Sequence, residues 1–224
     1  MNCFTHALPF LNDPYFAVGS CIPDWLSAVD RKVRTREKLA LPYLEDSNPD
    51  VASLAKGVIQ HHRDDDWFHQ THAFADLSMR FSLEIRDCLH GEAGFRAGLM
   101  GHIVIELLLD AYLDQLLPGK LEAFYETVAK VEPEFVQSTV NRFAKRDTEN
   151  LVRYIEGFLR ERYIFDYADD DRLLYRVNRV FARVKLEPFG SELKQWLPTA
   201  RQRVYENANA LLAAHPCALS NTTS

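Results

Sequence analysis

Histidine and carboxylate residues recur at helical spacing in two segments of the chain. His62, Asp66 and His69 are separated by four and then three positions, which would place the three side chains on one face of an α-helix. Mixed imidazole and carboxylate ligands suit Mn²⁺, Fe²⁺ or Zn²⁺, whereas Ca²⁺ and Mg²⁺ prefer shells made of oxygen alone. The first row therefore predicts a site for a divalent transition metal.

A second row lies in the apolar segment GHIVIELLLDAYL. His102, Glu106 and Asp110 again stand four positions apart. A carboxylate buried without a partner is strongly destabilising, so Glu106 and Asp110 require a cation or a set of hydrogen-bond donors. Two facing helices with such rows form a metal site. For each row, a hydrogen-bonded or salt-bridged pair without a metal is the alternative.

A second set of residues beside the first row has similar spacing, so the spacing alone does not decide which set faces the site. His61, Asp65 and His72 have nearly the same spacing as His62, Asp66 and His69. We interpret this second set as a solvated rim.

Four short motifs occur in order over about the first 115 residues, and together they resemble the acyl carrier protein phosphodiesterases, a distant branch of the HD-type metal phosphohydrolases. In the third motif, which starts at Gly57-Val58, His62 stands one residue beyond the position that the family spacing gives to the histidine. The matches are Met1-Asn2 with His6, Gly19-Ser20 with Asp24, Gly57-Val58 with His62-Arg63 and Asp66, and His102 with Glu106 and Asp110.

The resemblance implies a metal-dependent phosphodiesterase that releases 4'-phosphopantetheine from holo-acyl carrier protein, in fatty acid biosynthesis. Carried across by position, the implied metal ligands are His6, Asp24, His62, Asp66 and Asp110.

The chain departs from the family pattern at three places, which leaves the substrate open. His69-Gln70 replaces Thr-Asp, Glu106 replaces Asp, and Asp110-Ala111 replaces Asp-His. One alternative is a phosphohydrolase similar to zinc-dependent phospholipase C and related nucleases, a likeness that rests on spacing alone. The other is a helical metal-binding protein without turnover.

Two residues near the first row are candidates for catalysis. A bound ion would lower the pKa of its water and polarise a phosphoryl oxygen, and Arg63 could stabilise the charge on the phosphoryl oxygens. The alternative for Arg63 is a surface pair with Asp64 or Glu37. His69 is the candidate acid for the leaving oxygen, and its alternatives are a further metal ligand or a core histidine.

The elements that must position these residues are helices. The chain has only 9 glycines, and apolar residues recur every three or four positions, which predicts an all-α fold. We expect a single-domain multi-helix bundle over residues 1–214, HD-like if the resemblance holds, and a disordered tail at 215–224. Ser47 or Asn48 should cap a helix that starts near Pro49, and Pro118-Gly119 should form a turn. The predicted helices span 3–11, 19–32, 50–89, 92–117, 119–130, 132–146, 148–163, 168–186 and 190–214.

Composition excludes several classes of protein. The chain of 224 residues is 47% hydrophobic with a net charge of −6, and an acidic balance argues against a general nucleic-acid binder. Residues 1–110 carry this entire excess and seven of the eight histidines.

The expected location is the cytoplasm. The most apolar stretch, 99–117, carries four ionisable side chains, which argues against a membrane span, and the first residues lack the pattern of a signal peptide. Four cysteines without a CxxC pair indicate free thiols in a reducing compartment.

The second half of the chain offers one candidate surface for a partner. An arginine row beside an apolar stripe could dock an acidic carrier protein or a phosphate-bearing arm, although such rows are usually solvated flanks of a helix. The row is Arg172, Arg176, Arg179 and Arg183, and the stripe is Leu173, Val177, Val180, Phe181 and Val184.

Overall fold

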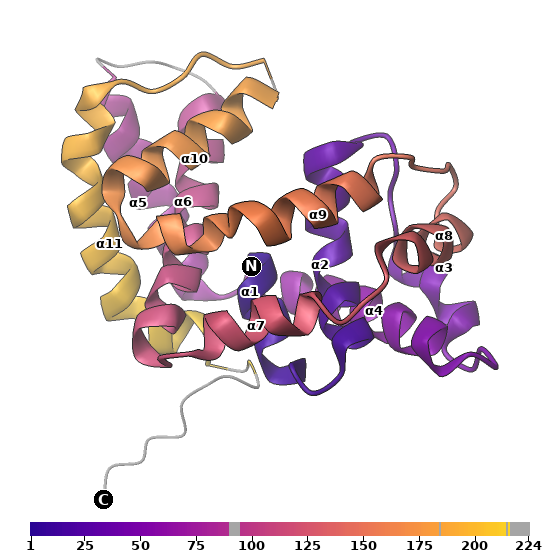
Figure 1. Cartoon of the computed structure of the whole chain (residues 1–224). Helices are drawn as coiled ribbons and strands as arrows, with labels where there is room; N and C mark the ends of the chain where they lie inside the picture. The colour runs from indigo at the N-terminus through magenta and orange to yellow at the C-terminus, as the bar shows by residue number, and fades with distance from the viewer. Residues whose placement is uncertain (90–94, 184, 214, 216–224) are drawn as a thin grey trace, which may run out of the picture. The chain divides into compact units, whose positions relative to one another are not determined.

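The computed structural model describes residues 1–89, 95–183, 185–213 and 215 (Figure 1). Regular structure in these residues is helical, and the only extended pairing among them is an isolated bridge between Thr35 and Ala144. The predicted all-α class is therefore confirmed. No helix in this part of the chain combines the length and apolar character needed to cross a membrane.

The described residues form two compact units, each built from two separate stretches of chain. Unit 1 comprises residues 1–66 and 117–162, and unit 2 comprises residues 67–116 together with the described residues from 163 onward. The helix that leaves unit 1 at Asp66 ends two residues later in unit 2. The single-domain organisation of 1–214 stays a prediction.

Unit 1 contains nine short or medium helices. Asn48 caps the helix at Pro49 as predicted, because its side-chain oxygen accepts a hydrogen bond from the Asp50 amide at 2.9 Å. The elements are α1 (Cys3–Ala7), η1 (Leu8–Phe10), α2 (Pro14–Val29), α3 (Glu37–Ala40), η2 (Leu41–Tyr43), α4 (Pro49–Phe68), α7 (Lys120–Val128), α8 (Pro133–Phe143) and α9 (Leu151–Glu161).

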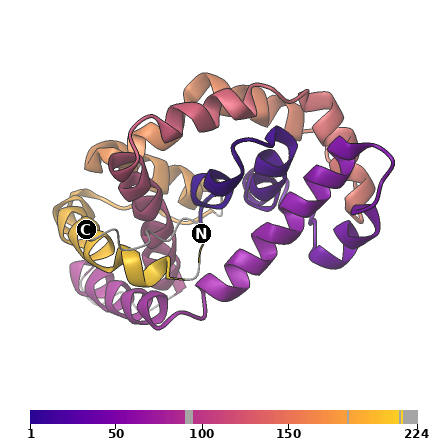
Figure 2. The same cartoon turned by 90° about the horizontal axis from the view of Figure 1, so that it is seen from below.

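Two glycines bring α2 and α4 into backbone contact. A Cβ atom at Gly19 would lie 2.4 Å from the Leu54 carbonyl oxygen, and one at Gly57 would lie 2.2 Å from the Phe16 carbonyl oxygen. Both distances are far below a normal contact, so only glycine permits this approach. Figure 2 shows α4 running alongside the N-terminal helices of unit 1.

The core of unit 1 is aromatic. Phe124 lies 5.6 Å from Phe4 and 5.9 Å from Phe158 between ring centroids, and Phe158 lies 5.1 Å from Trp25. Contacts of this kind stabilise a core beyond the area they bury. They fasten α1, α2, α7 and α9 together, which gives the N-terminal segment a fixed place.

Unit 2 is a smaller group of helices with its own core. Phe81 and Trp196 pack edge to face at 5.0 Å, and the Trp196 indole N–H donates to Glu84 at 2.9 Å. Gly101 lies against the Phe81 side chain, where a Cβ atom would approach to 3.0 Å. The elements are α5 (His72–Cys88), α6 (Phe95–Leu116), η3 (Tyr163–Ala168), α10 (Asp170–Arg183) and α11 (Ser191–Leu211).

The prediction of one continuous helix over 50–89 is wrong. The chain turns between α4 and α5, where the amides of Gln70 and Thr71 bond to carbonyls three residues earlier. Thr71 then caps α5 by accepting a hydrogen bond from the Phe74 amide at 3.2 Å. Threonine is a strong N-cap residue, so its capping side chain starts a new helix although the apolar periodicity continues across the break.

Other boundaries differ in smaller ways. Helix α2 starts at Pro14 and not near 19, because the Asp13 side chain accepts from the Phe16 amide and Pro14 occupies the first turn. The predicted turn at Pro118-Gly119 is confirmed by the positive φ of 82° at Gly119. Of the predicted tail, 215–224, only His215 lies within the described residues, and it is buried.

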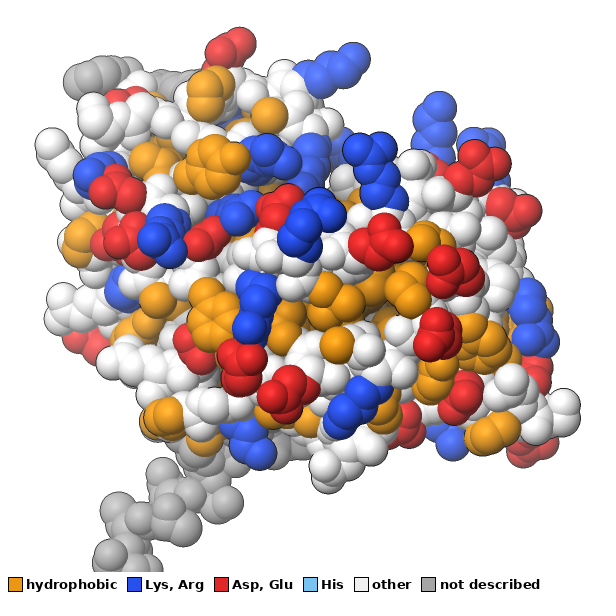
Figure 3. Space-filling view, in the orientation of Figure 1, with side chains coloured by type: hydrophobic (Ala, Val, Ile, Leu, Met, Phe, Trp, Pro, Cys, Tyr) orange, Lys and Arg blue, Asp and Glu red, His pale blue; other side chains and the backbone are white. Residues whose placement is uncertain are grey.

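The arginine row lies on α10 beside the apolar stripe. Leu173, Val177 and Phe181 are buried as predicted, whereas Val184 lies outside the described residues. Arg172 and Arg176 both pair with Asp166, the latter at 2.7 Å. On the face drawn in Figure 3, basic side chains are interspersed with acidic ones.

Candidate metal centre

Three side chains of unit 1 converge in an arrangement that can hold a metal ion. His6 Nε2 lies 3.3 Å from Asp65 Oδ1, and His61 Nε2 lies 3.3 Å from Asp65 Oδ2. All three ligand atoms lie within 4.8 Å of one another. Donor atoms bonded at about 2.1 Å to one ion are roughly 3.0 to 3.4 Å apart in octahedral or tetrahedral geometry. Both nitrogen–oxygen distances fall within this range, each to a different oxygen of Asp65, so small rotations of the side chains would bring the three residues around one ion. We call His6, His61 and Asp65 the buried triad.

The glycine contact between α2 and α4 positions His61. Ser20 follows Gly19 on α2, and His61 stands one helical turn after Gly57 on α4. At this close approach the His61 Nδ1–H donates to the Ser20 carbonyl at 2.8 Å. The hydrogen bond fixes the tautomer of the ring and directs Nε2 toward Asp65, which is how metal-binding histidines are commonly oriented.

A second carboxylate orients His6. Its Nδ1 atom lies 3.2 Å from Asp64 Oδ2, and Asp64 Oδ1 accepts a hydrogen bond from the side-chain amide of Gln60 at 2.7 Å. A carboxylate behind a histidine is a frequent outer partner in metal sites because it raises the basicity of the imidazole. Both histidines of the triad thus have a partner that turns Nε2 inward.

The triad is electrostatically uneven. Burial lowers the pKa of His6, but Asp64 and Asp65 outweigh this effect and raise it to about 9. Burial and the positive charge of His6 lower the pKa of His61 to about 4. Burial raises the pKa of Asp65, but the hydrogen bond from His6 and the charge of the N-terminal ammonium are among the interactions that hold it well below its ordinary range. At neutral pH the group is an imidazolium, a neutral imidazole and a carboxylate.

The protonation of His61 leaves room for a cation between its Nε2 atom and Asp65. A neutral imidazole carries one N–H, and in His61 the Ser20 carbonyl takes that proton. The lone pair of His61 Nε2 then faces an oxygen of Asp65 at 3.3 Å. Two electron-rich atoms in this arrangement repel each other, and the cations that already contact Asp65, the N-terminal ammonium at 2.8 Å and the His6 imidazolium at 3.3 Å, lie at its other oxygen. The donor set of the triad therefore fits a divalent transition metal.

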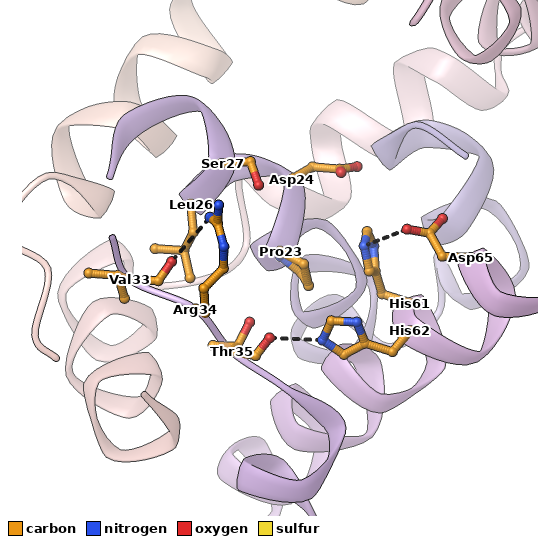
Figure 4. Close-up of a pocket in the computed structure, with 10 residues that line it drawn as sticks. All are labelled: Pro23, Asp24, Leu26, Ser27, Val33, Arg34, Thr35, His61, His62 and Asp65. Atoms are coloured by element: carbon orange, nitrogen blue, oxygen red, sulfur yellow. Dashed lines mark hydrogen bonds and ion pairs between the residues drawn. The ribbon is translucent and has the colours of Figure 1, made fainter. Parts of the chain in front are cut away.

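A pocket of about 200 Å³ opens beside the triad (Figure 4). His61 and Asp65 line it from α4, and Asp24 lines it from α2. Arg34 adds a cationic side chain from the segment that follows α2. His62 also lines the pocket and donates its Nε2–H to the Thr35 carbonyl at 2.8 Å. The pocket thus combines a carboxylate, a guanidinium and a titratable ring next to the candidate ligands.

The residues expected from the first row, together with Asp24 from the resemblance and the catalytic candidate Arg63, lie in different places. His62 and Asp24 reach the pocket, but Asp66 is exposed on α4. Arg63 is also exposed and forms an ion pair with Glu37 at 2.9 Å, which confirms the surface alternative for its contacts. His69 lies beyond the end of α4, so it cannot share a helix face with His62 and Asp66 as predicted.

His69 instead joins the second row, in unit 2. His69 Nε2 and His102 Nε2 each lie 3.1 Å from the same oxygen of Glu106. Burial raises the pKa of Glu106, but hydrogen bonds from the two histidines are among the interactions that hold it well below its ordinary value. Asp110 is buried one turn further along α6, outside this three-residue group.

His61 and Asp65 are the site residues that the sequence interpretation missed. The sequence pattern placed His61 in a solvated rim, whereas in the structure the residue is only 3% exposed. The signal was available in the third motif, where the strict spacing from Gly57-Val58 ends at His61 and not at His62. Gly57 faces α2, and the residue four positions later faces it too.

Comparisons with models of known protein families, with curated proteins and with solved structures find no match for this chain. The geometry of the side chains is therefore the evidence on function.

Proposed function

We propose that the protein is a metal-dependent phosphodiester hydrolase whose metal is held by His6, His61 and Asp65. The observation that carries the proposal is the approach of His61 Nε2 to Asp65 Oδ2 at 3.3 Å while the other ring nitrogen of His61 bonds to the Ser20 carbonyl, beside a pocket that Arg34 helps to line. When bound there, a divalent ion would polarise a phosphoryl oxygen and make water a better nucleophile.

The pocket residues supply binding and proton transfer. The Arg34 guanidinium attracts the anionic oxygens of a phosphodiester, for which a planar group with several donors is well suited. His62 holds its proton on Nε2 through the Thr35 carbonyl, so Nδ1 is the atom that exchanges a proton with water or with the leaving oxygen. Asp24 provides a carboxylate at the same pocket, either as a further ligand or as a base.

The size of the pocket supports a substrate that enters only in part. At about 200 Å³ it is smaller than the roughly 300 to 1,000 Å³ of pockets that enclose a whole small molecule. It therefore suits a phosphodiester group whose two substituents remain outside. Holo-acyl carrier protein, whose phosphopantetheine arm carries such a group, is the substrate that we propose.

Hydrolysis of bis-p-nitrophenyl phosphate tests the reaction class. Protein stripped of metal should gain activity on addition of Mn²⁺ or Zn²⁺, and Asp65→Asn should lower kcat/KM at least 100-fold. Asp66→Asn is the matched control, because Asp66 is the adjacent aspartate on α4 and is exposed; it should keep activity within about twofold.

Two results would contradict the proposal. One is equal activity of the Asp65→Asn variant and the unaltered protein. The other is metal binding at the triad without hydrolysis of any diester, which would favour a metal-binding protein without turnover. Release of apo-acyl carrier protein from the holo form tests the substrate separately, and hydrolysis of only the small diester would favour a phospholipase-like or nuclease-like substrate.

A further inference from the structure

We infer that unit 2 binds a second metal ion, Zn²⁺, through His69, His102 and Glu106. This site lies in a different unit from the buried triad and shares no residue with it. The inference goes beyond the proposed function and does not depend on it.

The geometry of the three side chains fits one zinc ion. Each histidine Nε2 lies 3.1 Å from Glu106 Oε1, and one ligand atom from each of the three residues falls within a 4.8 Å group. Atoms bonded to a common Zn²⁺ at 2.0 to 2.2 Å are about 3.3 to 3.5 Å apart in a tetrahedron. Small rotations of the side chains would therefore convert the hydrogen-bonded group into a zinc site.

The local fold holds the ligands in place. His102 and Glu106 are four residues apart on α6 and form an i, i+4 pair on one face. His69 comes from the turn between α4 and α5, whose amides are fixed by hydrogen bonds to α4 carbonyls. Phe74 packs against both imidazoles, at 4.8 Å from the His69 ring and 5.0 Å from the His102 ring. An apolar wall of this kind restricts ring motion and lowers the local dielectric constant.

Exposure distinguishes this site from the buried triad. The side chains of His69 and His102 are 32% and 40% exposed, and that of Glu106 is 17% exposed. Zinc held by three protein side chains completes its shell with water when the fourth position faces solvent, as in catalytic zinc sites. Two neutral imidazoles and one carboxylate would leave a net charge of +1, which favours an anionic ligand at that fourth position.

Metal counting on the full chain tests the inference. We expect equilibrium dialysis against Zn²⁺, followed by elemental analysis, to give one equivalent more for the unaltered protein than for His102→Ala. His72→Ala is the matched control, since His72 is an exposed histidine on α5 of the same unit; it should bind as much zinc as the unaltered protein. His69→Gln is a second variant, and circular dichroism verifies that each variant is folded.

Co²⁺ substitution gives a readout that a merely structural role would not change. A four-coordinate site gives intense visible absorption, and the part of this absorption that comes from the unit 2 site should be lost in His102→Ala and in Glu106→Gln but kept in His72→Ala. Equal zinc content and equal Co²⁺ spectra for His102→Ala and the unaltered protein would overturn the inference and leave a hydrogen-bonded His-Glu-His group.

The same measurements separate this inference from the proposed function. Loss of one equivalent in Asp65→Asn reports on the buried triad alone, and loss in His102→Ala reports on the unit 2 site alone. Either site can therefore fail without affecting the conclusion on the other.

Discussion

Substituting Gly57 by alanine should displace His61, a proposed metal ligand, although all the proposed ligand residues are still present in the variant. The added Cβ atom would lie 2.2 Å from the Phe16 carbonyl oxygen and 2.7 Å from the Ser20 amide nitrogen. Both are backbone atoms and cannot rotate away. Since carbon and oxygen normally approach to about 3.3 Å, α2 and α4 must separate by roughly 1 Å.

This displacement is large on the scale of metal coordination. Metal–ligand distances in proteins tolerate deviations of only about 0.2 Å, and His61 depends on the Ser20 carbonyl for its orientation. Loss of such an outer partner usually costs about 10- to 100-fold in metal affinity. We therefore expect Gly57→Ala to weaken zinc binding at the buried triad at least 10-fold, or about 1.4 kcal/mol.

Stability should fall as well. Overpacking costs about 1 to 3 kcal/mol, and the better helix propensity of alanine returns up to about 1 kcal/mol. Urea denaturation of the metal-free protein should thus show a loss of about 1 to 2 kcal/mol. Gly157→Ala on α9 is the matched control, because its added Cβ atom would lie 3.8 Å from the Arg160 side chain, an ordinary contact, so this variant should be as stable as the unaltered protein or more stable.

Zinc titration of both variants decides the outcome. If Gly57→Ala binds zinc at the buried triad as tightly as Gly157→Ala and unfolds at the same urea concentration, the close approach of α2 and α4 does not position His61. The glycine contact would then have no part in forming the buried triad, even if the protein proved to bind a metal elsewhere.

Three further perturbations give separate tests. Without metal, the raised pKa of His6, about 9 against 6.5 when unfolded, stabilises the fold fully below pH 6.5, and about 3 kcal/mol should be lost as the pH rises to 9; urea titrations at several pH values with EDTA measure this, and a stability that stays constant over that range would contradict it. Arg34→Ala should raise KM for a phosphodiester at least 10-fold, whereas Arg63→Ala should change KM less than twofold because the Arg63 guanidinium is paired with Glu37 at the surface. A larger effect of Arg63→Ala than of Arg34→Ala on KM would instead assign phosphodiester binding to Arg63. In unit 2, Glu84→Gln weakens the interactions with Trp196 and Arg203 and should cost about 1 to 2 kcal/mol, so an unchanged urea midpoint would show that this pairing contributes nothing.

The sequence by itself determined the all-α class and most of the helices. Helix formation depends on local periodicity and on capping residues, so the helices around Lys120–Val128 and Ser191–Leu211 were predicted within a few residues. The prediction from sequence was wrong where a capping residue and the apolar periodicity favoured different structures. At Thr71 the capping side chain ends one helix and starts another, although the apolar pattern continues across the break.

The sequence also identified the kinds of residue at the candidate sites, but the register of the ligands was decided by tertiary structure. Neighbouring residues on a helix point about 100° apart, so His61 and His62 cannot both face His6. The contact of Gly57 with α2 selects His61, and the aromatic core of unit 1 brings in His6 from 55 positions away. Likewise, the turn after Phe68 assigns His69 to Glu106 in unit 2. Spacing along one helix reports on one face, whereas a metal site requires that faces of different elements meet.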